Sequence, residues 1–161
     1  MQDWNGSETL TFTVEDDSSG TASDTVSVII TPVNDAPILT EIGNQETNED
    51  TPLVLTLEAT DVDEDDDLTF EAESDNENVT TFVSDDELML VPAENWYGTV
   101  NIYVSVIDGE LNDSEIFELT VNPMNDTPTI VLPESFTFEE DGSLVEDFSV
   151  FVDDIDEDIL T

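Results

Sequence analysis

The sequence predicts an all-β protein built from tandem Greek-key β-sandwich modules of about 90 residues each. Three observations lead to this prediction. Apolar residues alternate with polar ones in short runs, polar turn residues separate the runs, and whole phrases recur at a nearly constant spacing. No segment shows the apolar stripe of a helix, and about seven short strands in about 90 residues are typical of an antiparallel sandwich.

The strands expected in the middle module follow from a period of two. Leu53, Leu55 and Leu57 share one face of an extended segment, which Ala59 continues. The same alternation predicts strands over residues 68–70, 88–90, 100–106 and 117–121. These runs are rich in the β-branched and aromatic residues that favour strands. One apolar face per strand leaves the acidic residues for the outer faces and the loops.

The modular organisation is predicted from three pairs of similar phrases. "TPVNDAPIL" at 31–39 returns as "NPMNDTPTI" at 122–130, so that its Asn-Asp pair recurs 91 positions later. "DWNGSETLTFTVEDD" at 3–17 resembles "NWYGTVNIYVSVIDG" at 95–109. "NEDTPLVLTLEATDVDED" at 48–65 resembles "EEDGSLVEDFSVFVDDIDED" at 139–158. A sustained spacing of this length indicates tandem modules that join at the Asn-Asp phrases.

The domain boundaries follow from the same phrases. Residues 1–34 match the C-terminal part of a first repeat, residues 35–125 a complete repeat, and residues 126–161 the N-terminal part of a third. We interpret the chain as a window from a longer repeat array, whose modules have neighbouring repeats as partners.

The composition restricts the classes of partner. The chain has 43 Asp and Glu residues and no Lys, Arg or His, so that its formal net charge is −43. Two carboxylates about 10 Å apart in water repel by roughly 0.4 kcal/mol, and only solvent cations are available to neutralise them. Nucleic-acid binding is excluded because the chain has no basic side chain that could bind the phosphate groups. Insertion into a membrane is not expected because no apolar run approaches 18 residues.

The combined order of "NED", "ATDVDED", "NWYGT", "VIDG" and "VNDAP" resembles the cadherin-like tandem repeats of large bacterial surface and secreted proteins. The resemblance covers nearly the whole chain. It implies cadherin- or Ig-like sandwiches that Ca²⁺ makes rigid, in an extracellular or cell-surface protein without enzymatic activity. In such repeats the ions lie between consecutive modules.

The resemblance also implies metal ligands at each junction. Those of the second junction are Glu49, Asp50, Asn125, Asp126, Asp154 and Asp156. Those of the first junction are Asn34, Asp35, Asp61, Asp63 and Asp108. Two departures leave the number of ions per junction open. The chain lacks the arginine of the acidic-Arg-acidic motif, and Pro32 and Pro123 stand where an Asp would precede the Asn-Asp pair.

The acidic loops have the chemistry that Ca²⁺ requires. This hard ion takes six to eight oxygen ligands from carboxylates, carbonyls and water. Asp61, Asp63 and Asp65 place every second carboxylate on one side of an extended loop, and the prolines at 37 and 128 keep the linkers extended. The Asn-Asp phrase is therefore interpreted as a linker that a cation makes rigid. The alternative is a solvated acidic surface, as in proteins adapted to high salt.

The leading functional hypothesis is a Ca²⁺-rigidified segment of an extracellular repeat stalk, adhesin or filament, with possible homotypic assembly or a surface ligand. One alternative is a ligand- or glycan-binding surface module that uses its loops or the aromatic residues Trp4, Trp96 and Tyr97. Another is an acid-rich halophilic spacer without specific metal sites. A glycosidase carboxylate pair is disfavoured, because a small sandwich with repeated acidic loops predicts no substrate cleft.

Overall fold

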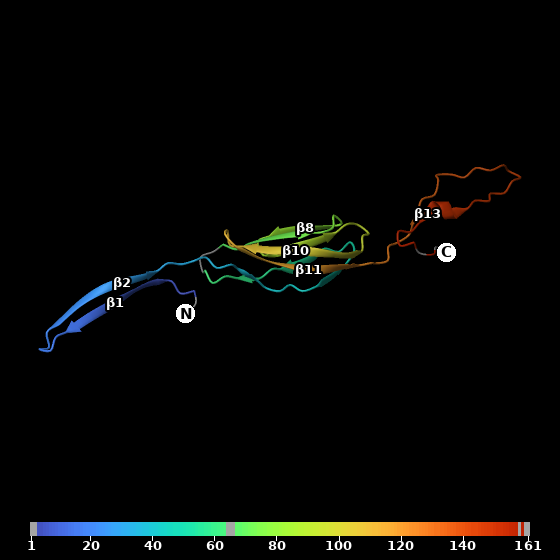
Figure 1. The fold of residues 1–161 in the computed structure, drawn as a ribbon. Coiled ribbons are helices and arrows are strands. Elements are labelled where there is room, and N and C mark those ends of the chain that lie inside the picture. The colour runs from blue at the N-terminus through green and yellow to red at the C-terminus, as the bar shows by residue number, and fades with distance from the viewer. Residues whose placement is uncertain (1–2, 64–66, 158, 160–161) are drawn as a thin grey trace.

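The structure is a computed structural model that describes residues 3–63, 67–157 and 159. Asp65 and Asp158, which belong to the repeated acidic phrases, lie outside the described residues. The described chain is almost entirely β, with one short 3-10 helix, and this confirms the predicted fold class. It forms three parts in a row: a long hairpin, a sandwich and a C-terminal part (Figure 1). Among the described residues, no helix is long and apolar enough to span a membrane.

The sandwich occupies the middle of the chain and has two main sheets. The strands of the four-stranded sheet lie in the order β4 (Gln45–Asn48), β11 (Asn112–Asn122), β10 (Gly98–Ile107) and β7 (Thr69–Ser74). Those of the three-stranded sheet lie in the order β5 (Leu53–Thr56), β9 (Glu87–Pro92) and β8 (Val79–Ser84). A further small sheet pairs β3 (Ile38–Leu39) with β6 (Ala59–Thr60).

The core lies between the two sheets and is built from alternate residues of the strands. On β10, Ile102 and Val106 are fully buried, while Tyr103 between them is 45% exposed. On β9, Leu88 and Leu90 are also fully buried and approach the core from the other sheet. The strands predicted at 88–90, 100–106 and 117–121 are therefore confirmed, each within a somewhat longer strand.

The segment predicted as one strand over residues 53–59 is divided between two sheets. β5 pairs with β9, whereas β6 pairs with β3. The change occurs at Leu57, which is 2% exposed and whose backbone N–H donates to the carbonyl of Asp86 at 2.7 Å. The next carbonyl, that of Glu58, accepts from the N–H of Thr40 at 2.8 Å. The apolar alternation continues through the crossing, so it predicts extended backbone without showing the change of sheet.

One strand pair departs from the predicted antiparallel arrangement. β4 runs parallel to β11, with Gln45 opposite Leu119 and Asn48 opposite Asn122. The pairing continues one residue further, because the N–H of Glu49 donates to the carbonyl of Asn122 at 2.9 Å. β4 has the sequence "QETN", which contains no apolar alternation, so its contribution to the sheet is entirely through the backbone.

The two end parts repeat elements of the sandwich. β1 (Gly6–Glu15) and β2 (Thr21–Ile30) form an antiparallel hairpin, as β10 and β11 do. β12 (Thr129–Ile130) pairs with β13 (Val152–Asp153), as β3 pairs with β6. The short helix η1 (Phe148–Phe151) adds two rings to a cluster with Phe136, at centroid distances of 5.9 and 6.0 Å.

A tryptophan and a glycine begin each long hairpin in the same way. Gly98 has φ of +149°, and a Cβ there would lie 3.0 Å from the Trp96 ring. Gly6 has φ of +143°, and a Cβ there would lie 3.1 Å from the Trp4 ring. Trp96 packs against the core, whereas Trp4 is 40% exposed. The glycine is required at both places because it readily adopts this backbone and lets the indole approach the strand this closely.

Candidate metal sites at the two junctions

The second junction begins where the ends of β4 and β11 meet the linker. Glu49 follows β4 and is only 3% exposed. Its side chain accepts a hydrogen bond at 2.5 Å from the backbone N–H of Met124, in the linker that follows β11. The chain contains no basic side chain that would pair with this carboxylate. A buried carboxylate without a counter-charge is costly, so Glu49 marks a place where a cation would be stabilising.

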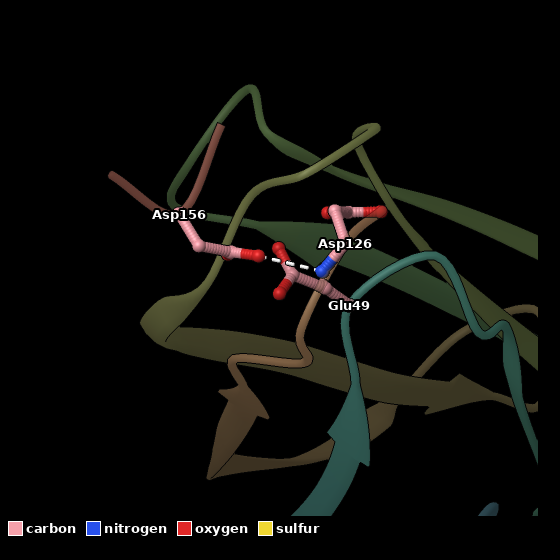
Figure 2. A group of neighbouring side chains, drawn as sticks. All are labelled: Glu49, Asp126 and Asp156. Atoms are coloured by element: carbon pink, nitrogen blue, oxygen red, sulfur yellow. Dashed lines mark hydrogen bonds between the residues drawn. The ribbon is translucent and has the colours of Figure 1, made fainter. Parts of the chain in front are cut away.

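The linker and the C-terminal part supply two further carboxylates. The N–H of Asp126 donates to Oδ2 of Asp156 at 2.5 Å, and the N–H of Asp156 donates to Oδ1 of Asp154 at 3.0 Å. One carboxylate oxygen each of Glu49, Asp126 and Asp156 lies within 4.8 Å of the others (Figure 2). A single ion with ligands at about 2.3–2.6 Å spans this separation. The three groups come from the sandwich, the linker and the C-terminal part.

The electrostatics of Asp126 reflect this crowding. Desolvation of its carboxyl raises its pKa, and the charges of Asp156, Asp50, Glu49 and Asp154 raise it further. Its Oδ2 atom is buried and has no hydrogen-bond donor among the described residues. A buried carboxylate oxygen without a donor fits a metal ligand, because a cation would satisfy the lone pairs that no N–H reaches.

Two of the expected ligands at this junction have other contacts. Asp50 is exposed, has φ of +57° and accepts the backbone N–H of Asn95 at 2.9 Å. Asn125 is exposed and donates its side-chain amide to the carbonyl of Asp126 at 2.7 Å. The geometry therefore brings Glu49, Asp126 and Asp156 together, while Asp50 and Asn125 hold the surrounding loop and linker.

The first junction repeats the same contacts. The N–H of Asp35 donates to Oδ2 of Asp63 at 2.9 Å, and the N–H of Asp63 donates to Oδ1 of Asp61 at 2.9 Å. Oδ2 of Asp61 is buried and has no donor among the described residues. Desolvation raises the pKa of Asp35, with further contributions from the charges of Asp3, Asp63 and Asp61. Both junctions thus contain a buried carboxylate oxygen that the described chain leaves without a donor.

Asp108 has a positioning role at the first junction. Its Oδ1 accepts the N–H groups of Glu110 and Leu111, each at 2.7 Å. The Leu111 bond, followed by the Glu110 bond, lowers the pKa of the Asp108 carboxyl. Oδ2 accepts the side-chain amide of Asn34 at 3.0 Å, and the same amide donates to the carbonyl of Asp35 at 3.1 Å. Asp108 therefore ties the linker to the turn between β10 and β11.

Asp3 is a junction residue that the sequence reasoning missed. It has φ of +65° and lines a hollow of about 260 Å³ together with Trp4, Asp35 and Asp63. Its signal in the sequence is its place before the repeated tryptophan, where the middle module has Asn95. Asn95 has the same backbone conformation, with φ of +54°, and lies against Asp50 at the second junction.

Comparison with known proteins supplies the family context. The sequence profile described as "Bacterial Ig domain" matches residues 34–120. An endo-fucoidan hydrolase from glycoside hydrolase family 107 is similar in structure with 18% identity and a TM-score of 0.44; the match covers 74% of this chain and 19% of the hydrolase. The chain therefore spans about a fifth of that enzyme's length. No protein of curated function matches the sequence.

Titin domains are also similar in structure. The titin domains z1z2 in complex with telethonin match with 16% identity and a TM-score of 0.43, over 72% of this chain and 61% of that one. The titin M3 domain matches with 16% identity and a TM-score of 0.38, over 53% of this chain and 96% of the domain.

Proposed function

Because the chain belongs to the bacterial Ig domain family over residues 34–120, we propose that it is a structural module of an extracellular or cell-surface protein. In this proposal it is one segment of a long cadherin-like repeat stalk, adhesin or filament, and Ca²⁺ makes its junctions rigid. Its partners are the neighbouring repeats of the same longer chain. The proposal assigns it no enzymatic activity, because the carboxylates that converge among the described residues, Glu49, Asp126 and Asp156, lie at a junction between modules.

One observation carries the metal assignment. At each junction one buried carboxylate oxygen, on Asp61 and on Asp126, has no hydrogen-bond donor within the described part of the chain. The two residues are not copies of each other in the repeat, since Asp61 belongs to an acidic loop and Asp126 to a linker. They lie in the same local arrangement of linker and loop carboxylates. A general excess of acid would leave such oxygens in water, so their burial supports specific cation sites.

Calcium is the ion that suits these ligands. The side chains that could bind the ion here offer oxygen atoms, because the sequence contains no His or Cys and the converging groups are carboxylates. Hard oxygen donors in flexible loops suit Ca²⁺, whereas Mg²⁺ requires a smaller and more regular octahedron. At the second junction Glu49, Asp126 and Asp156 would hold the ion, and the Asp154 carboxylate would support Asp156 by accepting the backbone N–H of Asp156. At the first junction Asp35, Asp61 and Asp63 would hold it, with Asp3 nearby.

The proposed mechanism is suppression of bending at the linkers. A cation at the second junction would contact the sandwich, the linker and the C-terminal part at once, so rotation about the linker would break coordination. A site with a Kd of about 10⁻⁴ M in about 1 mM Ca²⁺ contributes roughly 1.4 kcal/mol. This is a large fraction of a typical stability of about 5–15 kcal/mol once several sites act together.

The glycan-binding alternative has less support. Of the three aromatic residues considered, Trp96 has its ring close to Gly98 and packs against the core. Tyr97 is 59% exposed, but it is not part of that packing. Stacking on a sugar ring needs an exposed aromatic face, so this pattern supports a structural role for Trp96.

The decisive experiment separates specific calcium sites from general salt effects. Thermal unfolding is measured in CaCl₂ and in KCl at equal ionic strength. The proposal expects CaCl₂ to raise Tm well beyond KCl. Equal Tm values would favour the halophilic spacer instead. A crystal structure from calcium-containing solution provides the direct check, with an ion expected beside Asp126 and Glu49 and another beside Asp61.

A further inference from the structure

The hairpin of β1 and β2 exposes a face that is buried in the sandwich. β1 repeats β10, and β2 repeats β11, in the same register, because Gly6 lies opposite Ile30 as Gly98 lies opposite Val121. We call the apolar surface of this hairpin the hairpin face. Its members are Leu10, Phe12, Val14, Val26 and Val28.

The hairpin face corresponds residue by residue to the sandwich core. Counted from the shared glycine, Leu10 stands at the position of Ile102, and Phe12 at that of Val104. Leu10 and Phe12 are 44% and 62% exposed, whereas Ile102 and Val104 are 0% and 1% exposed. The same contrast holds on the second strand, where Val26 is 47% exposed and its counterpart Phe117 is 2% exposed.

We infer that the hairpin face is a docking surface for a three-stranded sheet of the β5–β9–β8 type, supplied by a copy of the same repeat. This sheet covers the equivalent face of β10 and β11 in the sandwich, where Leu88 and Leu90 are fully buried against it. Two strands with one solvated apolar face are at best marginally stable alone, and a second sheet packed on that face would complete them.

The polar residues on the face fit the same partner. Asp24 lies opposite Phe12, as Glu115 lies opposite Val104. In the sandwich, Glu115 accepts the N–H groups of Ile42 at 2.9 Å and of Gly43 at 3.4 Å, in the loop between β3 and β4. A docked copy of the repeat would bring this loop to Asp24. Glu8 stands at the position of Val100 on this face. A docked sheet would cover this acidic side chain, and the sandwich shows no hydrogen-bond donor for it because its counterpart is a valine.

The C-terminal part of a second chain does not have the required strands. Among its described residues it contains only β12, β13 and η1, which include no counterparts of β8 and β9. Another hairpin packed face to face would bury apolar side chains, but it would offer no N–H groups to Asp24. The β5–β9–β8 sheet with its preceding loop satisfies both the apolar and the polar groups.

The experiment adds this sheet to the chain in the same register that it has in the sandwich. A copy of residues 36–92 is placed directly before Met1, so that Met1, Gln2 and Asp3 follow Pro92 as Ala93, Glu94 and Asn95 do. The chain contains no cysteine, so Phe12→Cys provides a single reactive thiol. Thr11→Cys is the matched control, because Thr11 corresponds to Tyr103 on the outer face, which is 45% exposed.

We expect maleimide labelling of Phe12→Cys to slow by about tenfold or more in the lengthened chain, while labelling of Thr11→Cys stays unchanged. Unchanged labelling of Phe12→Cys would overturn the inference. So would protection in the original chain that disappears on dilution, since this would identify a second hairpin as the occupant. Hydrogen exchange of β1 in the chains without cysteine gives the same test if a variant fails to fold. Protection is expected in EGTA as well, so this result does not depend on calcium.

Discussion

The carboxylate of Glu49, which is 3% exposed, accepts a hydrogen bond from the backbone N–H of Met124. This contact fixes a buried negative charge at the point where the linker leaves the sandwich. Asp126 and Asp156 complete a group of three carboxylates that lies between parts of the chain far apart in sequence. The behaviour of this group in the presence and absence of calcium gives the first predictions.

Removal of calcium is expected to loosen the junctions. Addition of EGTA should lower Tm by several degrees, because each site contributes about 1–2 kcal/mol at millimolar calcium. It should also broaden the distribution of interdomain angles, because crowded carboxylates repel one another. Calorimetry measures the first effect and small-angle scattering the second. Identical profiles with and without EGTA would contradict the metal assignment.

Glu49→Gln is expected to weaken calcium binding by at least about tenfold, because it removes a charged ligand and keeps the acceptor for Met124. In EGTA the variant should be no less stable than the original chain, since it no longer buries an uncompensated charge. Titration calorimetry gives the affinity. Glu46→Gln, at the exposed Glu46 of the preceding strand β4, is the control for loss of one charge. Equal affinities of the two variants would exclude Glu49 as a ligand.

The pH dependence of stability in EGTA follows from the raised pKa of Asp126. A carboxyl whose pKa is raised in the folded state binds its proton more tightly there than when unfolded. It therefore destabilises the fold above the folded pKa, and this effect is relieved as pH falls through that pKa towards the usual value. Asp108 has a lowered pKa and acts oppositely, so its stabilisation is lost only at lower pH.

Asp126→Asn should therefore stabilise the chain in EGTA at neutral pH, and its advantage over the original chain should shrink on acidification. Urea unfolding at a series of pH values measures this difference. Glu71→Gln changes the charge equally at an exposed position on β7 and serves as the control. A difference between Asp126→Asn and Glu71→Gln that does not vary with pH would argue against the raised pKa as its cause.

Gly98→Ala is expected to destabilise the sandwich by about 1–3 kcal/mol, because φ is +149° and the new methyl group would lie 3.0 Å from the Trp96 ring. Gly43→Ala is a matched control with φ of +67° and no atom within 4 Å of the added carbon. It should cost less, about 1 kcal/mol, since only the backbone is strained. Equal losses in urea unfolding would mean that the indole contact contributes nothing.

The sequence predicts a strand where apolar and polar side chains alternate, but it gives no signal for a strand that pairs through its backbone alone. The segment that contains Ile102 and Val106 is predicted as a buried strand because every second residue in it is apolar. The strand β4 could not be found in this way, because "QETN" pairs through its backbone and buries no apolar side chain. The change of sheet at Leu57 was missed for a related reason, since alternation continues through it.

The candidate sites were predictable as far as the repeat determined them. The repeated phrases and the cadherin-like resemblance predicted Glu49, Asp126 and Asp156 among the ligands, and the structure brings these three carboxylates together. They did not distinguish carboxylates that converge from those that hold loops, as Asp50 does for Asn95. This distinction depends on which backbone N–H groups a loop presents. The sequence pattern alone contains no such information. Asp3 was overlooked because its one signal in the sequence is its place before the repeated tryptophan.

The parallel pairing of β4 with β11 determines how the sandwich would respond to tension along its length. The chain passes from the first linker through β3 and the following loop into β4, and it leaves β11 into the second linker. Pulling on the two linkers therefore draws β4 and β11 in opposite directions. Their hydrogen bonds then lie across the line of pull and are loaded together in shear. These hydrogen bonds would have to break together and not one at a time. The short polar strand β4 would therefore provide much of the module's resistance to mechanical unfolding.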